Sequence, residues 1–269
     1  MRKRNIIIGI LVVIAIIVLW VAVGFHNTLE VTTYVVEIPD LPEELQDFKI
    51  VQISDLHYKS FGENNEELVA LIKGERPDVI VITGDTIDGT KELFEPIEGL
   101  LAGISNLCPV YEVGGNHELD SEYYYGRLLE LFEKYGVQEL RNESVRYTKN
   151  GADIVFYGIP YGMGLESMQI AQKSEVSVLL AHDPTVADYV TTYGYDLMLS
   201  GHAHGGVVRI PFVGGILGTN REFFPKYDGG VYCCADMIMV NSRGLGESKY
   251  VPRFYNDPEI VSIILSAGL

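Results

Sequence analysis

The chain has 269 residues, which is long enough for one large domain with a real core or for two small ones. Lys and Arg number 20 against 37 Asp and Glu, so the formal net charge is -17. A surface this acidic repels nucleic acid phosphates and anionic lipid headgroups, which argues against DNA or RNA as a partner bound through its backbone.

The N-terminal segment predicts a membrane anchor. From Ile6 to Phe25 there are 20 residues without a charged side chain, and about 20 are needed to cross the bilayer core as a helix. Trp20 suits the far interface, and the basic residues 2–4 favour insertion with the N-terminus inside the cell. The rest of the chain is then extracytoplasmic, held at the cell membrane by a single-pass helix. A signal peptide cleaved after the small residues Ala22 and Gly24 is the alternative, although its apolar region would exceed the usual ~7 to 15 residues.

Beyond the anchor, residues 1–25, strand-like and helix-like segments alternate. Residues 26–46 are expected to be a linker and lead-in strand, and residues 47–269 a single domain, because no second linker, repeat or low-complexity stretch interrupts them. Apolar runs rich in β-branched residues predict strands, and apolar side chains at helical spacing predict helices. The predicted strands cover residues 48–54, 77–83, 109–114, 145–159 with a hairpin turn at 149–151, 176–181, 195–200, 227–240 and 258–265. The predicted helices cover residues 64–75, 91–107 and 121–136.

The three cysteines, Cys108, Cys233 and Cys234, do not form the pattern of a disulfide framework. Their number is odd, and two of them are adjacent. The stretch GVYCCADMIMV is otherwise typical of a buried strand, so we expect its two cysteines to be small apolar fillers.

Polar residues that can bind metals stand at the ends of five predicted strands. In open α/β sheets ligands gather outside the carboxyl ends of the strands, so these side chains are expected to converge on one site. Each motif alone is also typical of a turn or cap, and a lone histidine is more often a core or surface residue. Five of the six histidines nevertheless fall in these motifs. The residues are Asp55 and His57, Asp85 and Asp88 after Gly84, Asn116 and His117, His182, and His202 with His204.

The pair in GHAHGG carries more information than the other motifs. Side chains two residues apart in an extended segment project to the same side, so His202 and His204 can face one point. The flanking glycines remove side chains that would obstruct that point. Alone, the pair could still hold one ion weakly or none.

The ordered set D-x-H, G-D-x-x-D, G-N-H-E, a lone H and G-H-x-H resembles the calcineurin-like metallophosphoesterase family. The similarity runs from about Phe48 to His204, and the segments that follow resemble the bacterial membrane-associated branch of YkuE/YaeI type. The resemblance implies an α/β sandwich of two mixed β-sheets flanked by helices, here with one N-terminal transmembrane helix. Where some members carry Asp after the motif histidine, this chain has Glu118.

The resemblance also implies a dinuclear metal centre. Imidazole and carboxylate ligands suit divalent Mn, Zn, Fe, Co or Ni, and two such ions roughly 3.5 to 4 Å apart can make a hydroxide from bound water and clamp the oxygens at phosphorus. The expected function is hydrolysis of a phosphodiester, phosphomonoester or pyrophosphate at the outer face of the membrane. By resemblance, one ion takes Asp55, His57 and His204, the other takes Asn116, His182 and His202, and Asp85 bridges the two.

Further roles are implied around this centre. His117 is expected near the phosphoryl group, where it can protonate the leaving oxygen or stabilise charge. Glu118 would orient that imidazole or a ligand, and Asp88 would support a ligand histidine or cap a turn. Arg209 and Arg243 would bind substrate oxygen charge or be plain surface arginines.

Two alternatives stay open. The anchor and the apolar, aromatic segment 210–227 favour a lipid-linked or cell-wall-linked pyrophosphate or phosphodiester as substrate, unless that segment only covers the core. The other alternative is a catalytically silent, metal-stabilised surface interaction module. Such modules usually lose ligands, whereas all seven candidate ligands are present here.

Overall fold

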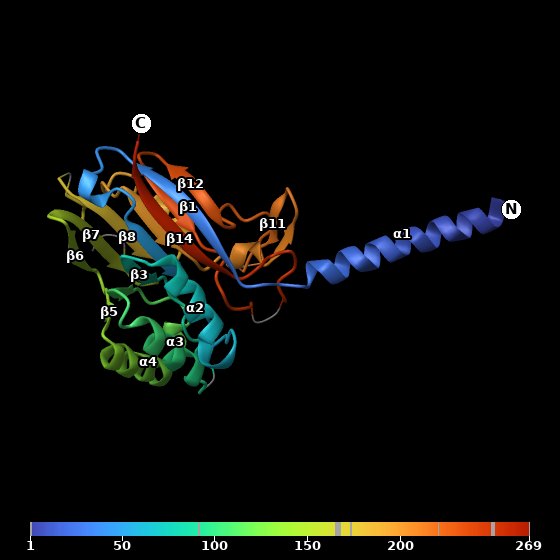
Figure 1. The fold of residues 1–269 in the computed structure, drawn as a ribbon, viewed down its shortest axis with the longest axis horizontal. Coiled ribbons are helices and arrows are strands. Elements are labelled where there is room, and N and C mark those ends of the chain that lie inside the picture. The colour runs from blue at the N-terminus through green and yellow to red at the C-terminus, as the bar shows by residue number, and fades with distance from the viewer. Residues whose placement is uncertain are drawn as a thin grey trace.

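Two six-stranded mixed β-sheets packed face to face form the domain, seen in a computed structural model that describes residues 2–90, 92–164, 168–172, 174–219, 221–248 and 251–268 (Figure 1). This confirms the expected sandwich. The first sheet has the order β1 (Glu30–Ile38), β14 (Glu259–Ala267), β2 (Lys49–Ile53), β3 (Val79–Ile82), β4 (Val110–Glu112), β5 (Val137–Glu139). The second has the order β12 (Gly230–Cys234), β13 (Met237–Asn241), β9 (Leu197–Ser200), β8 (Val176–Ala181), β7 (Ala152–Ile159), β6 (Glu143–Lys149). A small hairpin joins β10 (Val208–Ile210) to β11 (Gly214–Leu217).

Where neighbouring strands run parallel, their carboxyl ends lie at the same edge of each sheet. In the first sheet β2, β3, β4 and β5 run parallel. The helices α2 (Glu66–Glu75), α3 (Glu95–Ile104) and α4 (Glu122–Tyr135) connect them and lie together on one side of the domain (Figure 1). In the second sheet β7, β8, β9 and β13 run parallel. The carboxyl ends of β2, β3 and β4 therefore share one edge, as do those of β8 and β9.

The core forms layers on both faces of the first sheet. Val79 and Val81 of β3 face the second sheet, whereas Ile80 and Ile82 face the helices, so the whole strand is apolar. Phe156 of β7 lies fully buried between the sheets, with its ring 5.2 Å from that of Tyr111. A third apolar cluster covers the outer face of the second sheet, beneath loops and the short helix η5 (Pro184–Asp188).

The predicted hairpin turn at residues 149–151 is confirmed. Asn150 and Gly151 have φ of 55° and 96°, the left-handed conformation that a two-residue turn between twisted strands requires. The predicted helix start at residue 91 is wrong by several residues. Residues 92–94 are not helical and Lys91 lies outside the described residues, whereas α3 begins at Glu95, with Pro96 in the first turn where its missing N–H does no harm.

The expectation of a single buried strand around the adjacent residues Cys233 and Cys234 is also wrong. The segment forms the hairpin β12–β13, with Ala235 at a φ of 56° in the turn. Because β12 is the edge strand of its sheet, every second side chain faces solvent, so Cys233 is exposed and Cys234 half-buried. All three cysteines are free thiols.

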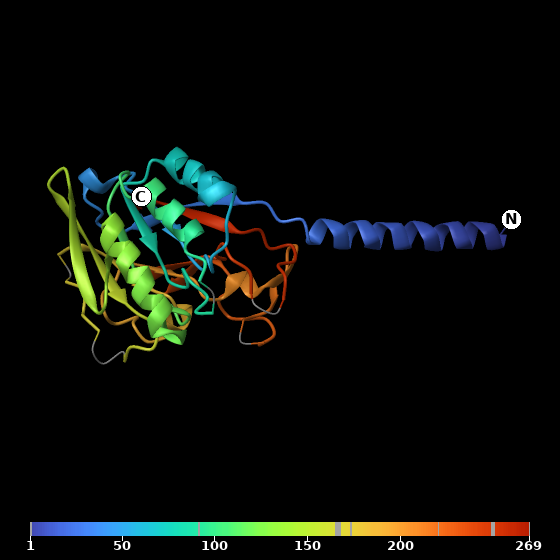
Figure 2. The same cartoon turned by 90° about the horizontal axis from the view of Figure 1, so that it is seen from below.

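The N-terminal helix α1 (Arg2–Gly24) projects away from the domain (Figure 1), and Figure 2 shows the same arrangement from below. By length and composition, Lys3–Gly24 is apolar enough to cross a membrane. Only residues 25–29 separate α1 from β1. The end of the helix is also fixed to the domain, since the backbone N–H of Tyr255 donates to the Gly24 carbonyl at 2.6 Å.

Glu112, at the end of β4, is a fully buried acid. Neither carboxyl oxygen has a hydrogen-bond partner within the described part of the chain. Burial raises the pKa of Glu112 well above 4.5, and the charges of Glu118 and Glu139 raise this pKa further. Burial therefore favours the neutral, protonated form of this side chain in the folded protein.

We predict that Phe156→Ala lowers the free energy of unfolding by about 3 to 5 kcal/mol, because it leaves a cavity between the sheets. The same change at the exposed Phe212 should alter this free energy by less than about 0.5 kcal/mol. Denaturant unfolding of both variants in detergent, followed by circular dichroism, measures the difference. Equal effects would contradict the packing described here.

Glu112→Gln should stabilise the protein in a pH-dependent way. Because folding raises the pKa of Glu112, the contribution of this side chain to the free energy of unfolding is complete below pH 4.5. That contribution is lost as the pH rises above 4.5. The neutral amide removes this loss, so the change in unfolding free energy caused by the substitution should be more favourable at pH 8 than at pH 4. Denaturant unfolding at both pH values with chelator present tests this, and the exposed Glu133→Gln should show no such dependence.

Candidate metal centre

The strand ends bring the predicted ligands together where the edges of the two sheets meet. Asp55 follows β2, Asp85 follows β3 and Asn116 follows β4 in the first sheet. His182 and His202 follow β8 and β9 in the second. The convergence expected from the sequence therefore arises from parallel strands in both sheets.

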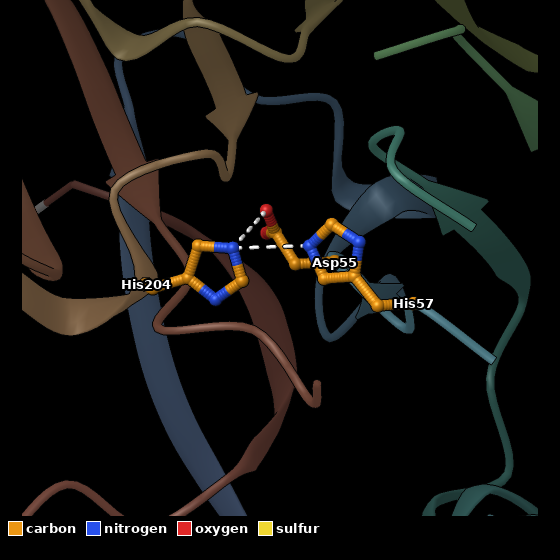
Figure 3. A group of neighbouring side chains, drawn as sticks. All are labelled: Asp55, His57 and His204. Atoms are coloured by element: carbon orange, nitrogen blue, oxygen red, sulfur yellow. Dashed lines mark hydrogen bonds and ion pairs between the residues drawn. The ribbon is translucent and has the colours of Figure 1, made fainter. Parts of the chain in front are cut away.

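A first cluster consists of Asp55, His57 and His204, which point toward one another (Figure 3). The Nε2 atoms of the two histidines are 3.1 Å apart, and Nε2 of His204 lies 3.5 Å from Oδ1 of Asp55. One ligand atom from each of the three residues lies within 4.8 Å of the others, an arrangement that can hold a metal ion.

A second cluster consists of Asp85, His182 and His202. Nδ1 of His202 is 3.1 Å from Nε2 of His182, which is 3.2 Å from Oδ2 of Asp85. The same Oδ2 lies 3.8 Å from Nε2 of His57 in the first cluster. Asp85 therefore stands between the two clusters, at the position expected of a bridging ligand.

Asn116 and two glycines complete the surroundings of these clusters. Oδ1 of Asn116 is buried and has no hydrogen-bond partner within the described part of the chain. A Cβ at Gly115 would lie 2.3 Å from Oδ1 of Asp85, and one at Gly201 would lie 2.5 Å from Oδ2 of Asp55. Only glycine fits these two positions, because the backbone passes so close to the carboxylates.

The backbone at the ligands is strained. Asp55, His57, Asp85, His202 and His204 have φ of 52°, 48°, 52°, 67° and 46°, in the left-handed region that non-glycine residues rarely adopt. Such conformations persist only where the surrounding structure holds them, and they cluster at functional sites. Here the N–H groups of Asp55 and His57 donate to the carbonyls of Gly84 and Asp85, both at 3.0 Å.

Glu118 holds two of the ligand loops in place. Its buried carboxylate accepts four backbone hydrogen bonds, at 2.7 to 3.3 Å, and reaches no imidazole in the described contacts. Glu118 is expected from the sequence to orient either the imidazole of His117 or a metal ligand. Its contacts favour the second role, because it binds the backbone N–H of the ligand Asp85. Burial raises the pKa of Glu118 to about 7, and the charge of Asp85 adds to this rise. The donors are the N–H groups of Asp85, Thr86, Ile87 and Gly115.

His117 lies beside the clusters and remains accessible, with 29% of its side chain exposed. Its Nε2 is 4.0 Å from Oδ2 of Asp85, and its Nδ1 is 2.8 Å from Oδ2 of Asp120, an ion-pair contact without hydrogen-bond geometry. Asp120 is not among the site residues predicted from the sequence. Its position three residues after His117 was the available signal, because a carboxylate there can orient an imidazole.

The other three candidates are engaged elsewhere. Asp88 accepts hydrogen bonds from the backbone N–H and hydroxyl of Thr90 at 2.9 and 2.8 Å, as a turn cap does. Arg209 donates to the carbonyls of Gly205 and Asp228, both at 2.6 Å. Arg243 pairs with Glu30 and with Glu259, the latter at 2.6 Å. These contacts favour structural roles for all three side chains.

Electrostatics within the centre favour a cation. Burial lowers the pKa of His57, and lowers that of His204 to about 3, so both imidazoles are neutral. Burial opposes ionisation of Asp55 and Asp85, but the neighbouring histidines outweigh it and lower the pKa of each carboxyl. At His182 burial is outweighed by the charge of Asp85, which raises the pKa to about 10. Ionised carboxylates and neutral imidazoles are the forms that bind divalent cations, so the first cluster has the protonation states that a cation needs, whereas His182 would release a proton on binding one.

Tyr161 is a further candidate that the motifs did not reveal. Its ring lies 5.6 Å from that of His202, and it lines a hollow of about 300 Å³ together with His182 and Tyr189. The available signal was its position just after β7, which is parallel to β8 and so ends at the same edge. This hollow offers space for part of a substrate beside the second cluster.

Comparison with known proteins gives a family match and several relatives. The sequence profile of the family described as calcineurin-like phosphoesterase matches residues 48–206. The uncharacterised metallophosphoesterase YkuE of Bacillus subtilis (strain 168) is 29% identical over 259 residues, covering 90% of this chain and 87% of that protein. Phosphodiesterase YaeI of Escherichia coli (strain K12) is 27% identical over 228 residues, covering 81% and 82%. The crystal structure of TT1561 of Thermus thermophilus covers 75% of this chain and 90% of its own, with a TM-score of 0.48 and 12% identity.

The family match spans more than half of the chain, and it includes the ends of all five strands that carry candidate ligands. The residues at those strand ends can hold metal ions. The chain therefore belongs to the calcineurin-like phosphoesterase family and is a phosphoester hydrolase.

Proposed function

We propose that this hydrolase works with two divalent metal ions, one on each side of Asp85. The observation that carries the proposal is the pairing of imidazole nitrogens: His57 with His204, and His182 with His202, each pair 3.1 Å apart. One nitrogen of each pair also lies near Oδ2 of Asp85: Nε2 of His57 at 3.8 Å and Nε2 of His182 at 3.2 Å. Two pairs of closely spaced nitrogens around one carboxylate suit two cations that share that carboxylate.

The donor set fits such ions. Asn116 brings a buried amide oxygen that lacks a partner within the described part of the chain, and Asp55 brings an ionised carboxylate to the first cluster. Nitrogen and oxygen donors without thiolate suit Mn, Zn, Fe, Co or Ni. The assignment we propose gives Asp55, His57 and His204 to one ion, Asn116, His182 and His202 to the other, and Asp85 to both.

Ions bound there would supply Lewis acidity toward a phosphoryl oxygen and lower the pKa of a bound water. His117 is the group we assign to the leaving oxygen. Because Asp120 faces its Nδ1, its Nε2 is turned toward Asp85, and its partial exposure leaves it open to a substrate. Glu118 and the strained backbone keep the carboxylates in position without taking part in proton transfer.

The substrates we propose are phosphodiesters, phosphomonoesters or pyrophosphates on the outer side of the membrane. The basic residues 2–4, at the N-terminal end of α1, support that orientation. A lipid-linked phosphoester is the more specific candidate. A hollow of about 870 Å³ opens where α1 meets the domain, lined by apolar Phe25, Phe61 and Leu71 and by the charged residues Lys59, Arg253, Glu67 and Glu247.

Metal counting on paired variants tests the division of ligands. The double variant His57→Ala, His204→Ala should lose one ion per chain and keep the other, because both residues are assigned to the same ion. The double variant His202→Ala, His204→Ala should lose both. Elemental analysis of purified full-length protein after equilibration with Mn or Zn reports the counts. Identical losses in the two variants would contradict the assignment.

Activity should depend on the bridging carboxylate. The full-length protein in detergent with Mn or Zn should hydrolyse an aryl phosphodiester or monoester, and Asp85→Asn should reduce the rate by about a thousandfold, because it removes a charged ligand shared by both ions. Asp153→Asn, a matched change in a surface ion pair, should leave the rate unchanged. Full activity in Asp85→Asn would refute the metal assignment. Stoichiometric metal without hydrolysis of a broad phosphate-ester panel would instead favour a non-catalytic module.

A further inference from the structure

The hairpin β10–β11 and the loop after it expose an apolar tip, made of Phe212, Val213, Phe223 and Phe224. Phe212 is fully exposed, and the others are 62%, 73% and 65% exposed. These four side chains face solvent and do not cover the core, whereas Tyr227, at the end of the apolar segment 210–227, packs into the third apolar cluster. Phe212 and Val213 lie in the hairpin turn, whereas Phe223 pairs with Leu217 and the N–H of Phe224 donates to the Ile216 carbonyl at 3.0 Å, at the other end of β11. Large exposed apolar side chains along one hairpin mark a surface that binds something.

The tip belongs to the end of the domain from which α1 emerges. In both views β11 and its neighbouring loops lie on the side that faces the helix, and β6 lies at the opposite end (Figures 1 and 2). The bilayer that α1 would cross is therefore on the same side of the domain as the hairpin.

Hydrogen bonds fix the hairpin to the end of α1. The backbone of Phe254 pairs with Val207 and Arg209, with the Arg209 N–H donating to the Phe254 carbonyl at 2.9 Å. The next residue, Tyr255, is bonded to the carbonyl of Gly24, and its hydroxyl donates to the carbonyl of Trp20 at 2.8 Å. One short segment thus holds both the hairpin and the helix end.

Aromatic packing strengthens this junction. The ring of Phe254 lies 5.3 Å from that of Trp20 and 5.0 Å from that of Phe25. Tyr255 also packs on Trp20, at 5.2 Å. Tyr and Trp rings are enriched where a protein crosses the membrane interface, so this cluster places the interface at the base of the hairpin.

We propose that the apolar tip enters the interfacial region of the bilayer that α1 crosses, as a second membrane contact. The proposal rests on the membrane-spanning role of α1 given above. The contact is apolar, because a chain with a net charge of -17 is repelled by anionic headgroups.

This contact would hold the metal centre close to the membrane surface. The hairpin follows η6 (His204–Gly206) directly, and Arg209 donates to the Gly205 carbonyl at 2.6 Å. Asn256, two residues after Phe254, donates to the His204 carbonyl at 2.7 Å. A ligand of the first cluster is therefore bonded to the same segments as the tip. The substrates that fit this placement are phosphoesters of lipids in the adjoining leaflet.

Tryptophan quenching tests the contact without requiring activity. Trp20 is the only tryptophan, so Trp20→Phe with Phe212→Trp leaves a single reporter at the tip. Trp20→Phe with Ser144→Trp places the reporter on exposed β6, at the far end of the domain. The full-length proteins are reconstituted in phosphatidylcholine vesicles whose acyl chains carry bromine, a short-range quencher.

We expect strong quenching for the reporter at 212 and none at 144. Equal quenching of the two reporters by the brominated lipid would overturn the proposal. This includes the case in which a second copy of the chain shields residue 212 from lipid. Because this readout needs no hydrolysis, it stays informative even where the proposed reaction fails.

A kinetic comparison tests the substrate class. The double variant Phe212→Ser, Phe223→Ser should hydrolyse an aryl phosphodiester carried on a lipid in vesicles roughly tenfold more slowly, with an unchanged rate on soluble bis-aryl phosphate. The matched control Val35→Ser, Val231→Ser, at two exposed strand positions, should change neither rate. The proposed substrate class would be refuted if wild type and tip variant had equal rates on the lipid substrate. It would also be refuted if the tip variant lost the same fraction of its rate on both substrates. Absence of hydrolysis in the wild type would count against the proposed reaction and not against the membrane contact.

Discussion

The two sheets are joined at the metal centre by polar groups that cross from one sheet to the other. Nδ1 of His182, from the second sheet, contacts the Thr83 carbonyl at the end of β3 at 2.7 Å. Gln52 of β2 donates to the Ser200 carbonyl of β9 at 2.8 Å. All these groups are buried, and buried polar groups are costly unless they are hydrogen-bonded. The edges of the two sheets must therefore meet in one register, and the ligand positions depend on it.

This junction also selects the atoms that face the centre. With Nδ1 of His182 turned toward Thr83, Nε2 is the nitrogen that points at Asp85. The backbone N–H of His202 contacts both carboxylate oxygens of Asp55 at 3.1 Å, which ties the second sheet to the first cluster. Ligands from separate parts of the chain are thus tied to one another by hydrogen bonds between the two sheets.

Much of this arrangement was predictable because it follows from strand order and spacing. The positions of Asp55, Asp85 and His182 after apolar runs placed them at carboxyl ends of strands. The partners of Glu118 were not predictable, because its hydrogen bonds go to backbone N–H groups that any sequence carries. The solvent-facing position of Cys233 could not be predicted for a different reason. Whether an apolar strand is central or at an edge of its sheet depends on how all the strands of the chain pair.

The bond between Gly24 and Tyr255 limits how the domain can move. A flexible linker would let a catalytic domain range over tens of ångströms around its anchor. Here only residues 25–29 lie between α1 and β1, and the helix end is bonded to the domain. A domain attached in this way turns and tilts with its helix, so encounters with membrane-bound molecules depend on lateral diffusion in the plane of the bilayer. Turnover of the lipid-linked substrate proposed above should then respond to its surface density in the membrane more than to the bulk concentration.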